Sequence, residues 1–492
     1  MLDTITDLKS LLKDPSLLPN KAYIAGDWVD AGDGATFAVT NPARGDVIAH
    51  VPDLTRADAA RAIAAADVAR RDWAARTGKE RAQILRRWFD LCMNAQDDLA
   101  AILTAEMGKP LAEAKGEIAY GSSYIEWFAE EAKRAYGEVI PGHMRDKRIS
   151  VIKQPIGVCA SITPWNFPNA MIARKVAPAL AAGCAMVSRP AAETPLSAIA
   201  LAVLAERAGV PAGVFSVITS RRASDIGKEF CENRAIRKLT FTGSTEVGRI
   251  LLRQAADQVL KCSMELGGNA PFIVFDDADL DAAVEGAMVS KFRNNGQTCV
   301  CANRIYVQAG VYDAFAEKLS AAVAKLNIGD GLTAGVTTGP LINMDAVDKV
   351  EEHIADVLAG GGKVVTGGAR HALGGTYFQP TVVTGVKPDM KVAQEETFGP
   401  LAPLFKFETE EEVIARANDT IFGLASYFYA RDIGRITRVQ EALEYGMVGV
   451  NTGLISNEMA PFGGVKQSGL GREGSHHGMD DYMEMKYICL SI

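Results

Sequence analysis

The sequence predicts an α/β protein that is built around buried parallel sheets and divided into at least two domains. From residue 151 onward, short apolar runs alternate with stretches of helical periodicity. Such alternation is typical of strand–helix–strand crossovers in a parallel sheet. The chain has 492 residues, whereas a single hydrophobic core stops growing at about 250–300 residues. We therefore expect two or three domains.

The elements follow in chain order. Residues 81–117 begin with an apolar stripe at Ile84, Leu85, Trp88, Leu91 and Cys92 that is typical of a scaffold helix packed on one face. The alternation then predicts strands at residues 158–162, 184–188, 214–219 and 238–242, and helices at residues 170–182, 195–208 and 224–231. A helix is expected to begin near Thr245.

After Glu265 the pattern starts again and predicts a second α/β domain. Strands are expected at residues 270–275 and 304–308, and helices at residues 280–294 and 312–326, with similar alternation to about residue 430. The terminal segment 482–488 alternates between apolar and polar residues, which predicts an exposed strand that needs a partner.

Composition excludes several classes of protein. The net charge of −8 gives no electrostatic reason to bind nucleic acid or an acidic membrane surface. No apolar run reaches the ~18 residues of a membrane span, and Met1–Thr4 lacks the basic start of a signal peptide. We therefore expect a cytoplasmic protein. The eight cysteines and six histidines show no metal-ligand spacing, so no metal cofactor is expected.

Two short segments indicate chemistry. Residues 292–301, Phe-Arg-Asn-Asn-Gly-Gln-Thr-Cys-Val-Cys, offer Cys299 as a nucleophile, and residues 264–269, Met-Glu-Leu-Gly-Gly-Asn, offer Glu265 as a base. Gly296 permits a tight turn before the thiol, and Gly267 and Gly268 permit close approach of the main chain. Either residue alone would more often be a buried cysteine or a solvated charge.

Other polar segments follow predicted strands, where ligands of doubly wound sheets bind. They are Thr163-Pro164-Trp165-Asn166, Arg189-Pro190 and Gly243-Ser244. Gly243 and Ser244 also precede a helix, so its first amides can receive a pyrophosphate. Taken alone, these two residues are equally a good helix cap.

Together these segments resemble the signatures of the aldehyde dehydrogenase superfamily, and the chain is most similar to its succinate-semialdehyde dehydrogenase branch. Further matching motifs are Phe241–Gly248 and Glu395–Pro400, and the resemblance runs from about Ala22 to the C-terminus. It implies a Rossmann-type cofactor-binding domain at residues 1–133 and 153–264, to which the chain returns at about 444–477. It also implies a catalytic domain at 265–443 and a small β oligomerisation element at 134–152 and 478–492, in a homodimer or homotetramer.

The resemblance assigns catalytic roles. The thiolate of Cys299 attacks an aldehyde carbon, Asn166 and the Cys299 backbone N–H hold the oxyanion, and Glu265 activates water to hydrolyse the thioester. The intact Glu265 argues against relatives that transfer the acyl group to coenzyme A. The resemblance places the cofactor on the following residues: Thr163, Pro164, Trp165, Arg189, Ala192, Ser220, Gly243, Ser244, Glu396 and Phe398.

The substrate implied is a carboxylated aldehyde. Arg174, Arg293 and Ser456 match residues that hold the distal carboxylate of succinate semialdehyde. Glutarate semialdehyde, one methylene longer, or another ω-carboxylated aldehyde is the alternative. The two arginines are otherwise interpreted as partners of structural ion pairs.

The cofactor implied is NADP, with NAD as the alternative. Arg189 replaces the usual lysine after the second strand, and Ala192 stands where NAD-preferring relatives carry a glutamate that would repel a 2′-phosphate. Ser220-Arg221-Arg222 lie nearby as possible phosphate donors, although Glu193 is adjacent and exposed arginines are often simply solvated.

Three further hypotheses stay open. The same cysteine, oxyanion hole and base would suit a cofactor-independent esterase. The fold also suits a catalytically inactive structural protein, which the complete set of site residues disfavours. Cys301 is either a small apolar residue or, as in the related branch, the partner of a reversible disulfide with Cys299.

Overall fold

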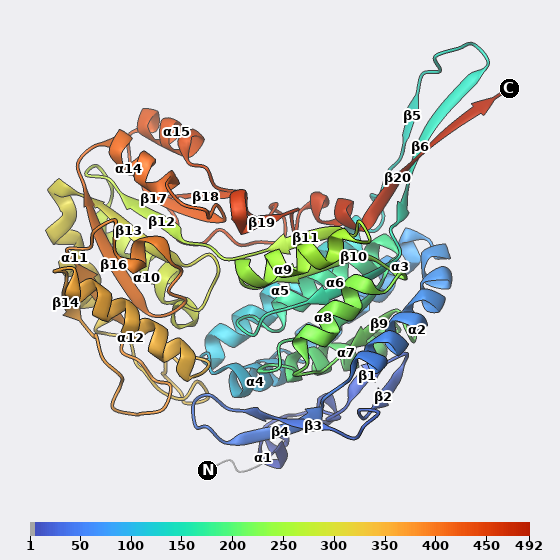
Figure 1. The fold of residues 1–492 in the computed structure, drawn as a ribbon, viewed down its shortest axis with the longest axis horizontal. Coiled ribbons are helices and arrows are strands. Elements are labelled where there is room, and N and C mark those ends of the chain that lie inside the picture. Colours follow the sequence, from blue (N-terminus) through green and yellow to red (C-terminus); the bar gives the residue numbers. More distant parts are fainter. Residues whose placement is uncertain (1–4) are drawn as a thin grey trace.

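The computed structural model describes residues 5–492 (Figure 1). Met1–Thr4, where we looked for the start of a signal peptide, lie outside the described residues. Two large sheets lie side by side, and a narrow antiparallel arm extends from one of them (Figure 1). This arrangement confirms the predicted α/β class.

The first sheet has a parallel centre and antiparallel edges. Its strands run in the order β19 (Gly469–Leu470), β11 (Lys261–Glu265), β10 (Ile236–Thr242), β7 (Val158–Ile162), β8 (Ala185–Arg189), β9 (Phe215–Val217), β1 (Ala22–Ile24) and β2 (Asp27–Val29). The helices of this part are α1 (Ile5–Ser10), α2 (Arg56–Ala75), α3 (Gly78–Asn94), α4 (Gln96–Met107), α5 (Leu111–Glu131), α6 (Ala170–Ala182), α7 (Leu196–Ala208), α8 (Ala223–Glu232) and α9 (Thr245–Ala256).

The second sheet is parallel except at one edge. Its order is β14 (Lys363–Thr366), β15 (Thr381–Thr384), β16 (Leu401–Phe407), β13 (Ala302–Gln308), β12 (Ala270–Val274), β17 (Ala425–Tyr429) and β18 (Met447–Val450). Its helices are α10 (Leu280–Phe292), α11 (Tyr312–Val323), α12 (Met344–Ala359), α13 (Lys391–Gln394), α14 (Glu410–Asn418) and α15 (Ile433–Ala442). A separate hairpin pairs β3 (Thr36–Thr40) with β4 (Val47–Pro52).

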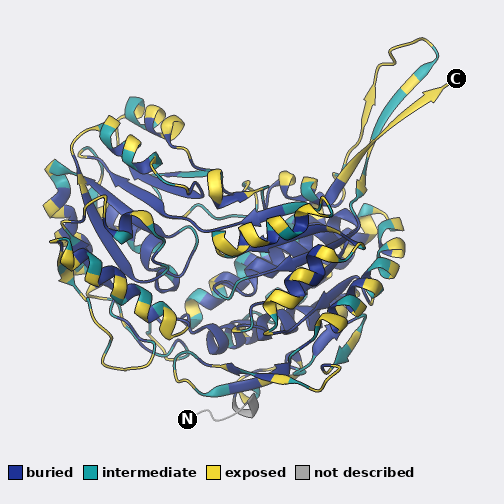
Figure 2. Ribbon diagram, in the orientation of Figure 1, coloured by how far each residue is buried: buried dark blue, intermediate teal, exposed yellow. Residues whose placement is uncertain are grey.

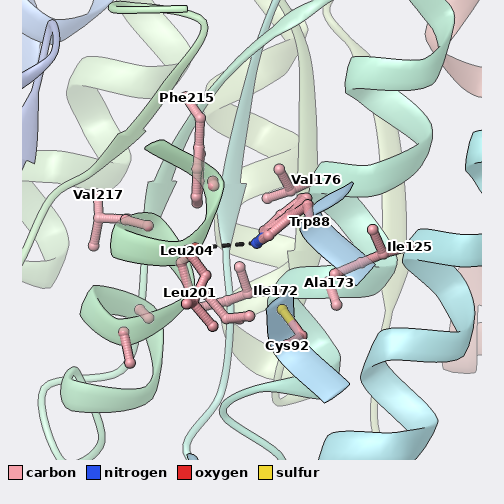
Figure 3. Close-up of a cluster of buried hydrophobic side chains, with 14 of the residues drawn as sticks. Trp88, Cys92, Ile125, Ile172, Ala173, Val176, Leu201, Leu204, Phe215 and Val217 are labelled. Atoms are coloured by element: carbon pink, nitrogen blue, oxygen red, sulfur yellow. Dashed lines mark hydrogen bonds between the residues drawn. The ribbon is translucent and has the colours of Figure 1, made fainter. Parts of the chain in front are cut away.

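The alternating segments form the predicted elements. β7 and α6 have the predicted bounds, and the other strands and helices of the crossover region differ by a few residues at their ends. The apolar stripe of α3 is buried except for the half-buried Leu91. Figure 3 shows Trp88 between α6 and α7, where its indole N–H donates to the carbonyl oxygen of Leu201 at 3.2 Å. The stripe therefore scaffolds the first sheet, as its pattern predicts.

Two segments differ from the predicted boundaries. We expected the chain to return to the first domain at about residue 444, but β18 still pairs with β17 in the second sheet. Only β19 pairs in the first sheet, beside β11. The hairpin expected at 134–152 contains β5 (Glu138–Ile140) and a longer β6 (Lys147–Pro155), because β6 pairs along its whole length with β20 (Met483–Ser491).

The arm formed by β5, β6 and β20 projects from the body and is exposed along most of its length (Figure 2). Large apolar side chains on it face solvent, among them Val139, Met485 and Tyr487. A three-stranded sheet without its own core needs a partner surface.

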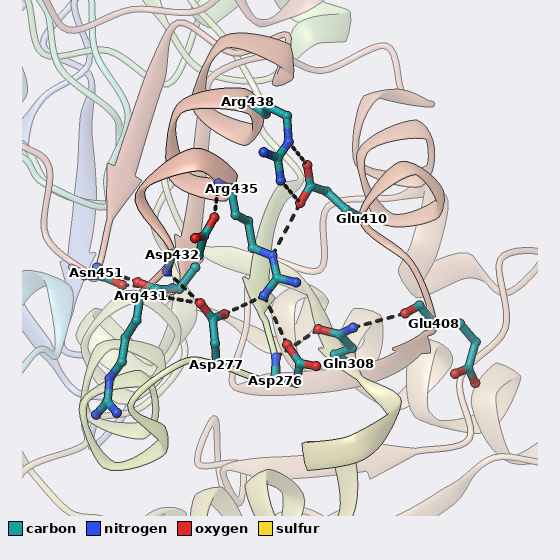
Figure 4. A network of polar contacts seen from close by, with 11 residues as sticks. Asp276, Asp277, Gln308, Glu408, Glu410, Arg431, Asp432, Arg435, Arg438 and Asn451 are labelled. Atoms are coloured by element: carbon teal, nitrogen blue, oxygen red, sulfur yellow. Dashed lines mark hydrogen bonds and ion pairs between the residues drawn. The ribbon is translucent and has the colours of Figure 1, made fainter.

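Charged residues gather at the carboxyl ends of the second sheet's strands (Figure 4). Arg435 lies 2.6 Å from Asp277 and 3.1 Å from Asp276, and its Nε lies 3.4 Å from Glu410, which also pairs with Arg438 at 2.7 Å. Because these groups satisfy one another, the network ties α15 to the ends of β12 and β16 rather than opening a ligand site there.

No helix of the described residues has the length and hydropathy needed to cross a membrane. Within the same part of the chain, no group of three or more histidine, cysteine, aspartate and glutamate side chains is arranged to hold a metal ion.

Candidate active site

Cys299 lies on a tight turn that follows α10. The helix ends at Phe292, two residues earlier than predicted, because Asn294 and Asn295 adopt left-handed backbone with φ of 53° and 56°, followed by Gly296 at 76°. A Cβ on Gly296 would lie 2.2 Å from the carbonyl oxygen of Gly399. Only glycine fits this turn, as the sequence suggested.

The glycines after Glu265 admit the loop of Cys299. A Cβ on Gly268 would lie 2.5 Å from the carbonyl oxygen of Cys299, and one on Gly267 would lie 2.9 Å from Glu396 Oε2. The two glycines therefore allow the Cys299 loop and the Glu396 carboxylate to approach the segment that follows Glu265. The end of the strand that carries Glu265 thus lies beside the loop of Cys299.

Three cavities meet around Cys299. A cleft of about 600 Å³ follows the carboxyl ends of β7, β8 and β10, and we call it the cofactor cleft. It shares Pro164, Trp165, Thr242 and Gly243 with a central cavity of about 300 Å³, which also contains Cys299, Glu265 and Asn166. A small substrate-side pocket of about 20 Å³ lies beyond Cys299. Cys299 is the residue that the central cavity and the substrate-side pocket share.

Glu265 is the last residue of β11, and it is 4% exposed. Burial and the neighbouring Glu473 raise the pKa of Glu265 well above its ordinary value, against the opposing charge of Arg174, Lys175 and Arg472. Its Oε2 has no hydrogen-bond partner among the described residues. A carboxylate with a raised pKa and a free oxygen facing a cavity suits a general base.

Cys299 needs such a base. Burial raises the pKa of its thiol to about 12, although Arg174 partly opposes the shift. At neutral pH the sulfur is therefore a thiol, and its reaction as a nucleophile requires removal of the proton.

Asn166 is held in place from both sides. Its carbonyl oxygen accepts from Lys109 Nζ at 2.8 Å and from Asn294 Nδ2 at 3.0 Å, and its own Nδ2 donates to the carbonyl of Gln297 at 3.0 Å. The second proton of that amide remains free for a ligand. The loop of Cys299 and the end of β7 are thus joined through Asn166.

A buried ion pair supports this arrangement. Lys109 Nζ lies 2.6 Å from Glu117 Oε2, and Glu117 Oε1 accepts the backbone N–H groups of Asn169 at 3.0 Å and Ala170 at 3.2 Å. Glu117 therefore caps α6 from α5. The sequence analysis missed Lys109, Glu117 and Asn294. Charged residues in an otherwise apolar helix region were the available signal for the first two.

The cofactor cleft suits a dinucleotide. Thr163, Pro164, Trp165, Arg189, Ala192 and Gly243 line it, and Ser244, Glu396 and Phe398 line the central cavity. Buried polar atoms without a partner in the described chain, Thr163 Oγ1, Thr242 Oγ1 and Arg189 Nε, provide hydrogen-bonding capacity here. Gly243 and Ser244 lie just before α9, whose N-terminus favours phosphate, and Ser244 also caps Val247 N at 3.3 Å.

Ser220 differs from its predicted place. It does not line the cofactor cleft, because its hydroxyl donates to the carbonyl of Leu54 at 2.7 Å inside the fold. Ser224 of α8 lines the cleft instead, together with Arg221. Arg222 pairs with Asp33 at 2.9 Å, which makes it a surface ion pair rather than a phosphate donor.

Glu396 and Phe398 line the central cavity together with Trp165. Glu396 Oε1 accepts the N–H of Gly268 at 3.2 Å, and burial raises its pKa to about 8. Phe398 has left-handed backbone, with φ of 53°, and its ring meets the Trp165 ring edge-on at 5.5 Å. Such strain in a bulky residue is concentrated at functional sites.

The substrate-side pocket contains the three predicted carboxylate-binding residues. Arg174, Arg293 and Ser456 line it together with Cys299. Arg293 has no ion pair or hydrogen bond within the described part of the chain, and its guanidinium lies 4.9 Å above the Phe167 ring.

Arg174 differs from Arg293 because it already has an anionic partner. Its Nη2 lies 2.6 Å from Glu473 Oε2, and its guanidinium lies 4.0 Å from the Phe462 ring. Arg174 therefore forms the buried ion pair that was the alternative interpretation, and it also lines the pocket, whereas its contact with a substrate's carboxylate stays a prediction. The sequence analysis missed Glu473, which lies far from α6 along the chain.

Cys301 lines none of the three cavities. It is buried, and Lys291 Nζ donates to its sulfur at 3.4 Å and to Asn303 Oδ1 at 2.9 Å. Cys299 and Cys301 are both free thiols in this structure.

The fold and site suit an enzyme that uses a cysteine and a carboxylate beside a cleft large enough for a dinucleotide. The Aldehyde dehydrogenase family model matches residues 28–488. The chain belongs to this family, which confirms the resemblance found in the sequence.

Characterised relatives match over almost their full length. A glutarate-semialdehyde dehydrogenase of Pseudomonas aeruginosa is 67% identical over 97% of this chain and 99% of the relative. An NADP(+) succinate-semialdehyde dehydrogenase of Escherichia coli is 64% identical over 98% of this chain and 100% of the relative. The crystal structure of a succinate-semialdehyde dehydrogenase from Burkholderia pseudomallei is similar with a TM-score of 0.97 at 65% identity, covering 98% of this chain and 100% of that one.

Proposed function

We propose that this aldehyde dehydrogenase oxidises succinate semialdehyde to succinate with NADP, through a thioester on Cys299. The observation that carries the proposal is the position of Cys299 between two cavities. One holds the base Glu265 and opens to the cofactor cleft, and the other contains Arg174, Arg293 and Ser456. The names of the similar relatives support the same class of carboxylated aldehyde.

The first step is attack of the Cys299 sulfur on the aldehyde carbon. Glu265 takes the proton of the thiol, and the carbonyl oxygen becomes an oxyanion. The free N–H of the Asn166 amide and the Cys299 backbone N–H stabilise that charge. Loss of one such donor typically costs about 10²–10³ in rate, and the fixed position of Asn166 means that little reorganisation is needed.

Glu396 and Phe398 would hold the nicotinamide end of the cofactor, and Gly243 and Ser244 its pyrophosphate. A nicotinamide held there would supply the hydride acceptor for oxidation of the carbon that is bonded to Cys299. Trp165 and Phe398 line the cavity at that point and restrict the access of water.

Glu265 then acts on water. It first passes the proton of the thiol to solvent and, as a carboxylate again, accepts a proton from a water molecule that attacks the thioester. The carbon–sulfur bond then breaks, which releases the acid, and the Cys299 thiolate takes the proton back from Glu265. Glu265→Gln is a close isostere without the basic function. Mass spectrometry of this variant after incubation with aldehyde and cofactor should detect the acyl group on the peptide that contains Cys299, formed slowly because the thiol also lacks its base. Cys299→Ser should carry none. An unmodified peptide in active Glu265→Gln would contradict the thioester route.

The carboxylate of the substrate is assigned to Arg293, Arg174 and Ser456. Hydrogen bonds to charged groups are worth about 1.5–3 kcal/mol each, which is enough to favour a carboxylated aldehyde strongly. Chain length is less strongly selected, because one methylene changes binding by only about 1–3 kcal/mol. Glutarate semialdehyde therefore remains the alternative substrate.

The choice of NADP rests on the residues around the far end of the cofactor cleft. Ala192 is small and uncharged, so it leaves room for a 2′-phosphate and does not repel it. Arg189 and Arg221 line the same cleft and provide positive charge. Glu193 lines the same region and opposes a phosphate, so NAD remains the alternative. A cofactor-independent esterase is tested in the same assay, because it would hydrolyse activated esters without nucleotide.

The exposed arm supports assembly into a dimer or tetramer. Its outer strands β5 and β20 each have one edge without a strand partner in the described chain, and its apolar side chains face solvent. Another copy of the chain would supply a surface for both. The domain bounds and a cytoplasmic location remain predictions from the sequence.

A further inference from the structure

Glu473 is a buried carboxylate between the substrate-side pocket and the base. Its Oε2 lies 2.6 Å from Arg174 Nη2, and its Oε1 lies 2.5 Å from Lys175 Nζ. The backbone of Glu473 exchanges two hydrogen bonds of 2.8 Å with Phe462, whose ring lies against Arg174. The carboxylate is thus fixed in position, and the steps described above do not use it.

The charges in this group do not balance at rest. Arg174 and Lys175 are two adjacent cations on α6, whereas Glu473 is one anion. Burial opposes the ionisation of Glu473, but Lys175 and Arg174 outweigh it and lower its pKa. Glu265 has the opposite shift, because burial and Glu473 raise its pKa. With Glu265 neutral, Arg174 and Lys175 carry one positive charge more than Glu473 balances beside the substrate-side pocket. Arg472 is a further cation near Glu265 that no carboxylate balances in the described chain.

Other titratable groups face this set from neighbouring elements. They are Tyr120 and Tyr124 of α5, Cys299 of the catalytic turn, Arg472 beside Glu473, and Tyr482 before β20. Arg472 donates to the carbonyl oxygens of Gly464 and Gly471 and has no carboxylate partner in the described chain. Burial raises the pKa of Tyr124, Tyr482 and Cys299, so these groups do not supply the missing anion at neutral pH.

We propose that Glu473 is a positioning residue that divides the charge of Arg174 between itself and the substrate's carboxylate, and that it thereby couples substrate binding to the ionisation of Glu265. The inference rests on the proposed roles of Arg174 and Glu265. A carboxylated aldehyde supplies the anion that balances the surplus charge. A neutral aldehyde leaves that charge uncompensated, which favours the ionised form of Glu265.

A difference between substrates follows. With a carboxylated aldehyde, Glu265 loses part of the positive field of Arg174, so its pKa is higher than with a neutral aldehyde. Because Glu265 must be ionised to accept a proton from water, the acid limb of thioester hydrolysis lies at higher pH for the carboxylated substrate. Glu473 limits the effect, since it already neutralises part of Arg174.

The test is Glu473→Gln, which keeps the shape and removes the charge. We expect KM for succinate semialdehyde, and Kd for succinate without turnover, to fall about tenfold, because Arg174 loses a competing anion. The acid limb of kcat should move to lower pH by about one unit, since one anion near Glu265 is gone. KM for butanal should not change. The matched control is Glu458→Gln in the preceding loop, whose carboxylate accepts from Ser123 Oγ at 3.1 Å and has no ion pair in the described chain.

Failure of the coupling is distinguishable from failure of the proposed function. If the wild type does not prefer carboxylated aldehydes, the proposed function is wrong. If it does, but Glu473→Gln weakens both substrates or leaves the acid limb in place, Glu473 has only a structural role and the inference is overturned. Should the single variant not fold, Glu473→Gln combined with Lys175→Met restores the charge balance, and succinate must still bind more tightly.

Discussion

Removing the charge of Arg293 should convert the enzyme toward a general aldehyde dehydrogenase. Arg293→Met keeps an apolar stem and deletes the guanidinium together with its contact with the Phe167 ring. Arg293 forms no ion pair or hydrogen bond in the described chain, so the substitution breaks no direct bond. The half-buried Glu113 loses the charge of Arg293 but keeps the stronger effect of Lys109 and the N–H of Asn294 at 2.8 Å, so the fold should be little affected. The change therefore isolates the interaction with the substrate.

The magnitude follows from the contacts that are lost. One hydrogen bond to a charged group is worth about 1.5–3 kcal/mol, and 1.4 kcal/mol corresponds to a factor of ten, so kcat/KM for succinate semialdehyde should fall by about 10- to 150-fold. Butanal has no carboxylate, and its kcat/KM should change less than threefold. For Arg293→Lys, kcat/KM for succinate semialdehyde should lie between the values of the wild type and of Arg293→Met, because an ammonium keeps the charge but not the planar fork.

The assay is the appearance of reduced cofactor at substrate concentrations well below KM, with unfolding curves recorded for each variant. Equal losses for succinate semialdehyde and butanal would refute the reasoning, since they would show that Arg293 shapes the pocket rather than binding the carboxylate.

Three further predictions follow. The rate of thioester hydrolysis by the wild type should increase with pH through the raised pKa of Glu265, because only the ionised form of Glu265 accepts a proton. A stopped-flow profile of this step that is flat between about pH 5 and pH 9 would contradict the expectation, and the profile of Glu265→Gln should be flat and slow. Ala192→Glu should lower kcat/KM with NADP by about 10- to 100-fold through charge repulsion and leave NAD use nearly unchanged, so equal effects on both cofactors would show that residue 192 does not contact the 2′-phosphate. Arg435→Met should lower the free energy of unfolding by about 1–2 kcal/mol at low salt and by less at high salt, because three carboxylates lose their shared cation. If urea titrations give the same loss at both salt concentrations, the loss comes from the packing of Arg435 on Phe275 and not from its charge.

Much of the fold could be predicted because its signals are local. The crossover strands are fully buried runs such as residues 158–162, and the helices between them are bounded by glycines such as Gly183 and Gly209, which adopt left-handed backbone at the helix ends. The end of α10 could not be placed from periodicity alone. The signal was the run Asn294-Asn295-Gly296, because asparagine and glycine adopt left-handed backbone more readily than other residues do.

The site could be predicted where residues act through short motifs, and it could not where they act through tertiary contacts. Cys299, Glu265 and Asn166 are marked by their neighbours in sequence, and the structure brings them to one cavity. Glu473 meets Arg174 across the fold, and Lys109 reaches Asn166 from another helix region. Ser220 has the right position in sequence, yet its hydroxyl is used inside the fold. Pairings between distant segments leave no periodic trace in a single sequence.

The measurement that tests the central claim most directly is kcat/KM for succinate semialdehyde, glutarate semialdehyde and butanal, each with NADP and with NAD. The structure predicts that both acids are preferred over butanal by at least about tenfold, because their carboxylate gains at least one charged hydrogen bond at Arg293, and that turnover is faster with NADP. Equal or better turnover of butanal would contradict the assignment of Arg174, Arg293 and Ser456 to the substrate's carboxylate.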